Sequence, residues 1–161
     1  MLLSYRVPRE PSTPRIAVWR KLKRLGIAQI SDGLVALPAD ARTREQLEWI
    51  ADERIEAGSA AGIWLGRPAA LAQERALAAG MAAARAEEYR AVLAQATEAL
   101  AADEATRTVT AQRLRAELRR IARRDYFPPP ERGHARAAVQ DLLDDAAAEQ
   151  EAVVQQGEEQ P

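Results

Sequence analysis

Arginines and carboxylates are the residues that could carry chemistry in this chain, because the other usual reactive side chains are nearly absent. The sequence has no cysteine and one histidine, His134, so thiolate metal sites, thiol nucleophiles and Ser-His-Asp arrangements lack their ligands or base. No glycine spacing matches a phosphate-binding loop. Adjacent carboxylates such as Glu87 and Glu88 diverge by about 100° on a helix and make poor acid–base pairs. We therefore predict a protein that is not an enzyme, with no catalytic residues, no metal and no cofactor.

Positive charge is concentrated in two segments of a chain whose formal net charge is -1. Residues 1–26 carry seven basic residues against Glu10, and residues 107–124 carry seven arginines against Glu117, which gives a local charge of +6 in each segment. Residues 141–161 carry seven acidic residues and no basic one. This segregation predicts either contact with a polyanion or attraction between the acidic tail and the basic segments.

The basic residues of both segments are expected to lie on helix surfaces. An amphipathic helix that ends near Gly26 places Val18, Trp19 and Leu22 on one side and its cationic side chains on the other. Such a face binds phosphates with salt-dependent affinity, and a plain solvated face is the alternative. The candidate nucleic-acid-binding residues are Arg20, Lys23, Arg24, Arg119, Arg120, Arg123 and Arg124.

A second candidate site consists of charges on otherwise apolar helical stripes. Arg85 falls within one such stripe, and Asp125 continues the stripe of Leu114, Leu118 and Ile121. Because an unpaired buried charge is costly, we predict that an arginine neutralises Asp125, Arg85 being the first candidate. The set can act as a structural clamp or, with Arg119 or Arg123, as an anion site. Its members are Arg85, Glu88, Tyr89, Asp125 and Tyr126, with either tyrosine as the hydrogen-bonding neighbour.

The first 67 residues are expected to form the α+β unit that positions the first basic helix. Pro14 follows Thr13 as a helix start, and Thr43 with Gln46 has the spacing of a capping box, opening a helix that ends at Gly58. The Asp32-Gly33 pair predicts a hairpin turn. Short apolar runs at 2–7, 27–31, 34–37 and 60–67 are typical of strands. The resulting order predicts a ferredoxin-like βαββαβ arrangement.

From Pro68 onward the composition changes to Ala, Glu, Arg and Leu, which favours helices. We predict helices over about 69–102, 108–126 and 133–153, with the prolines that follow Phe127 separating the last two. Residues 68–154 are expected to pack on unit 1–67, and Trp49 is expected to be either covered by these helices or exposed for a partner. Residues 155–161 are expected to be disordered. The predicted fold class is therefore α+β, with a ferredoxin-like N-terminal half and a three-helix C-terminal half.

The beginning of the chain does not resemble a signal peptide. Its apolar run is interrupted by Arg6 and Pro8, and no apolar run of membrane-spanning length follows. We expect a cytoplasmic protein without a membrane partner.

Two stretches of the sequence resemble a known family. The run SYRVPREPSTPRIAVWRKLKRLGIAQISDGLVALP, followed later by LRRIARRDYFPPP and a final amphipathic helix, is similar to the N-terminal domain of chromate resistance protein B (ChrB). The resemblance covers most of residues 3–150. The positions that match the family pattern are Arg20, Leu22, Gly26, Gly33, Pro38, Arg85, Glu88, Tyr89, Asp125, Tyr126 and Phe127.

The resemblance implies a bacterial protein associated with chromate efflux operons, in which the full-length family member acts as a chromate-responsive regulator. We expect DNA to be a partner, through the two basic segments, and a homodimer to form through strand edges or Trp49. The chain ends where the second domain of the complete regulator would begin. The alternative is therefore an interaction module that pairs with a separately encoded chromate-sensing domain and does not bind DNA.

Overall fold

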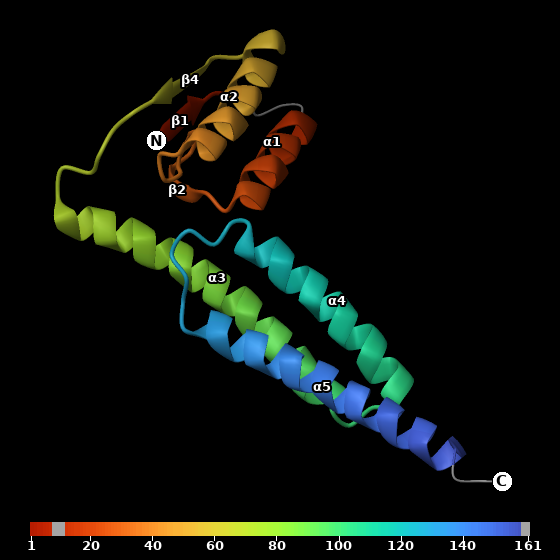
Figure 1. Ribbon diagram of the computed structural model, residues 1–161. Helices are drawn as coiled ribbons and strands as arrows, with labels where there is room; N and C mark the ends of the chain where they lie inside the picture. The colour runs from red at the N-terminus through yellow and green to blue at the C-terminus, as the bar shows by residue number, and fades with distance from the viewer. Residues whose placement is uncertain (8–11, 159–161) are drawn as a thin grey trace. The chain divides into compact units, whose positions relative to one another are not determined.

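The computed structural model of the chain describes residues 1–7 and 12–158, and of residues 12 and 146–158 it describes the backbone. Within these residues the fold is α+β, with a four-stranded antiparallel sheet and five helices. The chain forms two compact units (Figure 1), Met1–Met81, which we call the sheet unit, and Ala82–Pro161, which we call the helical unit. The border between the two units lies inside one long helix, Leu71–Ala99.

The sheet unit begins with strands and helices in the predicted order. Its elements are β1 (Leu2–Tyr5), α1 (Ser12–Leu25), β2 (Ala28–Ser31), β3 (Leu34–Ala36), α2 (Ala41–Glu56) and β4 (Ala61–Trp64). The strands lie in the order β2-β3-β1-β4, and every neighbouring pair is antiparallel. Leu3 pairs with Val35, and both are buried on the sheet face covered by α1 and α2 (Figure 1).

The apolar faces of both helices pack as the periodicity predicts. Val18 and Leu22 of α1 are fully buried. The periodicity of α2 predicts that Leu47, Ile50, Ala51 and Arg54 share one face, and all four are buried. Trp49 lies on the other side of α2 and is 71% exposed. The burial of Val18 and Leu22 therefore determines which side of α1 faces outward.

The starts of two helices differ from the prediction because an aspartate caps each of them. Asp40 replaces the expected Thr43 at one helix, and Asp103 starts the other before Thr108. At α2 the Asp40 carboxylate accepts a hydrogen bond from the Thr43 amide (2.8 Å), and the Thr43 hydroxyl accepts one from the Asp40 amide (3.1 Å). Asp103 caps α4 through the Thr106 amide (3.0 Å), so this helix begins four residues before Thr108. An ionised carboxylate is a strong acceptor for the free amides of a first turn, and these bonds lower the pKa of Asp40.

The Asp32-Gly33 turn connects β2 and β3 as predicted, with a detail that the sequence does not reveal. Of the two turn residues, Gly33 takes a positive φ (74°) and Asp32 does not. The register of the β2–β3 pair shifts between Gln29 and Ser31. The Gly33 carbonyl accepts a hydrogen bond from the Tyr5 amide at 2.8 Å. A Cβ at position 33 would lie 2.4 Å from the Tyr5 carbonyl oxygen.

We predict that Gly33→Ala destabilises the protein by about 2 kcal/mol, because it combines backbone strain with a clash against the β1 backbone. Gly58→Ala is the matched control, since Gly58 has the same φ (74°) and a Cβ there would meet nothing within 4 Å. Its expected cost is the conformational part alone, about 1 kcal/mol. Urea denaturation of both variants measures the difference, and equal midpoints would contradict the clash.

The helical unit is built from three helices. It contains the part of α3 (Leu71–Ala99) that follows Met81, together with α4 (Glu104–Ala122) and α5 (Glu131–Glu158). All three helices contribute to its main core, whose buried residues are Tyr89, Val92, Ala96, Leu114, Leu118, Ile121, Ala135 and Val139. The predicted stripe of α4 is confirmed in full, since Ala111 is buried as well. The periodicity of the preceding helix predicts an apolar stripe from Leu71 to Leu100. Its two ends are wrong, because Leu71 at the start of α3 and Leu100 just after α3 are exposed.

The last helix is longer than the sequence pattern predicts. Helix α5 begins directly after Pro130 and continues into segment 155–161, where we expected disorder; residues 159–161 lie outside the described residues. The side chains of residues 146–161, which include most of the acidic residues of the tail, likewise lie outside the part that the structure describes. Within the described part of the chain, none of the helices combines the length and the apolar character needed to cross a membrane.

Candidate functional site

Asp125 is the centre of a buried polar cluster in the helical unit. It follows α4 in the segment that leads to α5, and its side chain is 0% exposed. Its Oδ2 accepts a hydrogen bond from the Tyr89 hydroxyl of α3 at 2.9 Å. The same oxygen lies 3.4 Å from Nη1 of Arg132, in the first turn of α5. Asp125 therefore connects all three helices of the unit.

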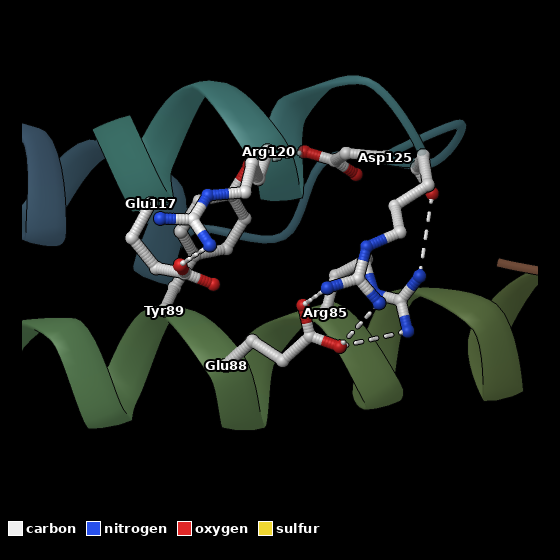
Figure 2. Close-up of polar contacts among 7 residues, drawn as sticks. Arg85, Glu88, Tyr89, Glu117, Arg120 and Asp125 are labelled. Carbon is white, nitrogen blue, oxygen red and sulfur yellow. Dashed lines mark hydrogen bonds and ion pairs between the residues drawn. The ribbon is translucent and has the colours of Figure 1, made fainter. Parts of the chain in front are cut away.

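The arginine that neutralises Asp125 is Arg132, and the prediction of Arg85 as first candidate is wrong. Arg85 lies 3.0 Å from Glu88, one turn along α3, and donates from Nη1 to the Arg124 carbonyl at 3.5 Å. The Glu88 carboxylate also pairs with the Arg124 guanidinium at 2.8 Å. Figure 2 shows Arg85 and Glu88 extending from α3 toward the segment that carries Asp125.

The cluster contains three arginines and two carboxylates, Glu88 and Asp125, so its formal charge is +1. Each carboxylate has an arginine within ion-pair distance. Burial lowers the pKa of Arg85, while Glu88 raises it and Arg124 lowers it further. Tyr126, the remaining predicted member, is half-buried next to Asp125. Glu88 and Asp125 already form ion pairs with the arginines of the cluster. This arrangement therefore fits a clamp between helices better than an anion site.

Tyr89 is the most strongly perturbed titratable group of the cluster. Burial, followed by its hydrogen bond to Asp125, raises the pKa of Tyr89 to about 12. The pKa of Tyr89 is thus higher in the folded protein than its ordinary value of 10.0. The neutral hydroxyl therefore stabilises the folded protein to its full extent below pH 10. This contribution is lost as the pH rises from 10 to about 12.

We predict that one tyrosine in the folded protein ionises near pH 12, visible in the ultraviolet absorbance of phenolate. Tyr89→Phe should remove this late step and leave the titration of the other two tyrosines in place, because it deletes only the buried hydroxyl. Tyr5→Phe is the comparison variant, because burial raises the pKa of Tyr5 as well. A late step that persists in Tyr89→Phe would contradict the assignment.

The basic side chains of α1 divide into a paired and an unpaired group. Arg15 lies 3.4 Å from Asp32, and Lys21 forms an ion pair with Glu53 of α2. The predicted phosphate ligands Arg20, Lys23 and Arg24 are exposed, opposite the buried face, and no carboxylate among the described side chains pairs with them. The Lys23 ammonium lies 5.0 Å from the centre of the Trp19 ring, a cation–π contact. The outer face of α1 is therefore cationic, and it has no carboxylate partner among the side chains that the structure describes.

The four predicted basic residues at the end of α4 do not share one environment. Arg119 and Arg123 are exposed, and Arg120 is exposed beside Glu117 at 3.3 Å (Figure 2). Arg124 is turned toward α3, where Glu88 holds it. Three of the four thus lie on the surface of the helical unit, whereas Arg124 belongs to the Asp125 cluster.

Sequence reasoning missed three arginines that the fold places beside the predicted ones. Arg132 completes the Asp125 cluster, while Arg115 and Arg136 lie with Arg119 along a groove between α4 and α5. The spacing of Arg115 and Arg119, one helical turn apart, was the available signal on α4. Nothing in the sequence places Arg136 beside them, because that contact depends on how α5 packs against α4.

One comparison with known proteins finds a match. A family model described as "Protein ChrB, N-terminal" matches residues 15–160, which is most of the chain and includes both basic helices and the Asp125 cluster. No curated protein and no solved structure matches the chain.

Proposed function

The chain belongs to the ChrB N-terminal family, which associates it with chromate resistance, and from this premise we propose that it regulates a chromate efflux operon by binding DNA phosphates. The proposed contacts are the exposed basic residues of two helices, namely Arg20, Lys23, Arg24, Arg119, Arg120 and Arg123. The role is non-enzymatic. Arg124 is left out of this set because it is committed to Glu88.

The observation that carries the proposal is the cationic outer face of α1. Two of the helix's cations, Arg15 and Lys21, have carboxylate partners, whereas the three on the outer face have none among the described side chains. An unpaired cation on a helix surface gains most from a phosphate, because binding releases the counterions that the nucleic acid holds. These contacts supply affinity and carry no base readout by themselves.

We also assign the sheet unit to the ferredoxin-like arrangement. The supporting observations are the βαββαβ order of its elements and the strand order β2-β3-β1-β4. In this arrangement both helices lie on one face of the sheet, so the outer face of α1 is directed away from the sheet and is open to a partner.

A mobility-shift experiment with the DNA upstream of the protein's own operon tests the proposal. We expect a shifted complex in low salt, and we expect the amount of this complex to differ with and without chromate. An absence of any shift at low salt would favour the alternative, an interaction module that pairs with a chromate-sensing domain without touching DNA.

A further inference from the structure

A groove of about 400 Å³ between α4 and α5 combines a cationic rim with an apolar floor. The floor is formed by Leu118, Ala122, Val139 and Leu143, and the rim by Arg115, Arg119, Arg136 and Gln140. No carboxylate is among the described lining residues, and no ion pair holds any of the three arginines in the described part of the chain. The groove thus offers concentrated positive charge beside an apolar floor, in which Ala122 and Leu143 are half-buried while Leu118 and Val139 are buried.

Helix α5 itself carries the complementary charge a short distance further along. Asp144 lies two turns beyond Arg136, is exposed, and accepts a hydrogen bond from Gln140 at 2.8 Å. Among the described residues, no ion pair involves Asp144. The positions 136, 140 and 144 are spaced by four residues, so they form one ridge of the helix. Arg136 and Asp144 lie on this ridge about 6 Å on either side of Gln140.

We propose that this groove binds α5 of a second copy of the chain, in an antiparallel two-fold pairing centred on Gln140. Residues equally far from the centre then face each other, so Arg136 meets Asp144 of the partner subunit, and Asp144 meets the partner's Arg136. The two glutamines at the centre face each other, and Leu143 packs on the partner's groove floor. Ridges of four-residue spacing that interdigitate in this way are the commonest mode of helix packing.

A second copy fits the groove better than a nucleic acid does. A phosphate backbone gains from the arginines but leaves the half-buried Ala122 and Leu143 in contact with water, whereas a helix covers these two residues and the rim. The charges along the ridge also match those of an antiparallel second copy. The ridge holds a cation, a neutral amide and an anion in that order, so each cation faces an anion of the partner. This dimer contact is separate from the proposed DNA contact. Because Arg119 lines the groove, the partner subunit covers it in the dimer, and Arg120 and Arg123 remain for contacts with phosphates.

The test is the oligomeric state of the full chain by sedimentation velocity over a range of concentrations. We expect a monomer–dimer equilibrium whose dissociation constant rises with salt. Arg136→Asp and Asp144→Arg should each weaken the dimer by about 10-fold or more, because each places like charges opposite one another. The double variant restores both contacts with reversed sign, and its dissociation constant should return to within about 3-fold of the parent's.

The control is Arg113→Asp, which makes the same change of charge on the α3 side of α4, where Arg113 contacts Gln95. It should leave the dissociation constant unchanged, and circular dichroism should show the parent's helix content in all four variants. A chain that stays monomeric throughout contradicts the inference. Single reversals that weaken the dimer without recovery in the double variant contradict it as well, as does a loss of DNA affinity in Arg136→Asp with unchanged mass.

Discussion

Asp125→Ala is expected to destabilise the helical unit by about 3 kcal/mol, the lower end of the cost of breaking a buried ion pair. The substitution leaves the Tyr89 hydroxyl, in a side chain that is almost fully buried, without its acceptor, and it leaves Arg132 without its carboxylate. The side chain of Arg132 retains some contact with water, which keeps the loss from being larger. Urea denaturation of the full chain measures the change in the free energy of unfolding.

Two further variants separate the charge of Asp125 from its hydrogen bond. Asp125→Asn keeps an acceptor for Tyr89 and loses the ion pair, so an intermediate loss of stability is expected. Asp141→Ala removes an exposed carboxylate of α5 and should change the free energy of unfolding by less than about 0.5 kcal/mol. An unchanged midpoint for Asp125→Ala, together with a lost response to an anion, would show that the cluster is an anion site and not a clamp.

Replacing Arg20, Lys23 and Arg24 together by alanine is expected to lower DNA affinity by roughly 100-fold in dilute salt. These side chains are exposed on the outer face of α1, opposite Val18 and Leu22, so the variant should fold as the parent does. Three lost phosphate contacts also lower the slope of log affinity against log salt by about 3. Fluorescence anisotropy of a labelled duplex at several salt concentrations measures both quantities.

The matched control for this variant removes the same amount of charge elsewhere in the sheet unit. Arg44, Arg67 and Arg75 are exposed and lie outside the α1 face, so their joint replacement by alanine should weaken binding by no more than about 3-fold. Equal losses in the two triple variants would mean that net charge governs the affinity. The outer face of α1 would then have no special part in it.

Local physical chemistry explains what could be predicted of the fold. Alternation and turn residues identify the four strands, because Leu3 and Val35 lie on one face and Gly33 supplies the positive φ that the turn requires. The buried face of α2 follows from periodicity alone. The helix starts at Asp40 and Asp103 were missed because Thr, Ser and Asp are all good caps, and their order of preference depends on geometry that forms only in the folded chain.

The candidate site could be predicted by type of residue but not by partner. An apolar stripe that ends in Asp125 requires an arginine, which the structure supplies. Which arginine it is depends on the path of residues 126–130, whose three prolines return the chain so that Arg132 lies beside Asp125. Contacts between helices that are distant in sequence, such as Arg136 with the α4 groove, have no local signal and therefore could not be predicted.

The salt dependence of DNA binding by the unmodified chain tests the central claim most directly. If the basic faces of α1 and α4 hold phosphates, the affinity for duplex DNA falls steeply as salt is raised, by about 0.9 logarithmic units per tenfold salt for each contact. Five or six contacts therefore predict a slope of about 5. Binding that is absent in dilute salt, or whose affinity stays constant as salt is raised, would contradict the account.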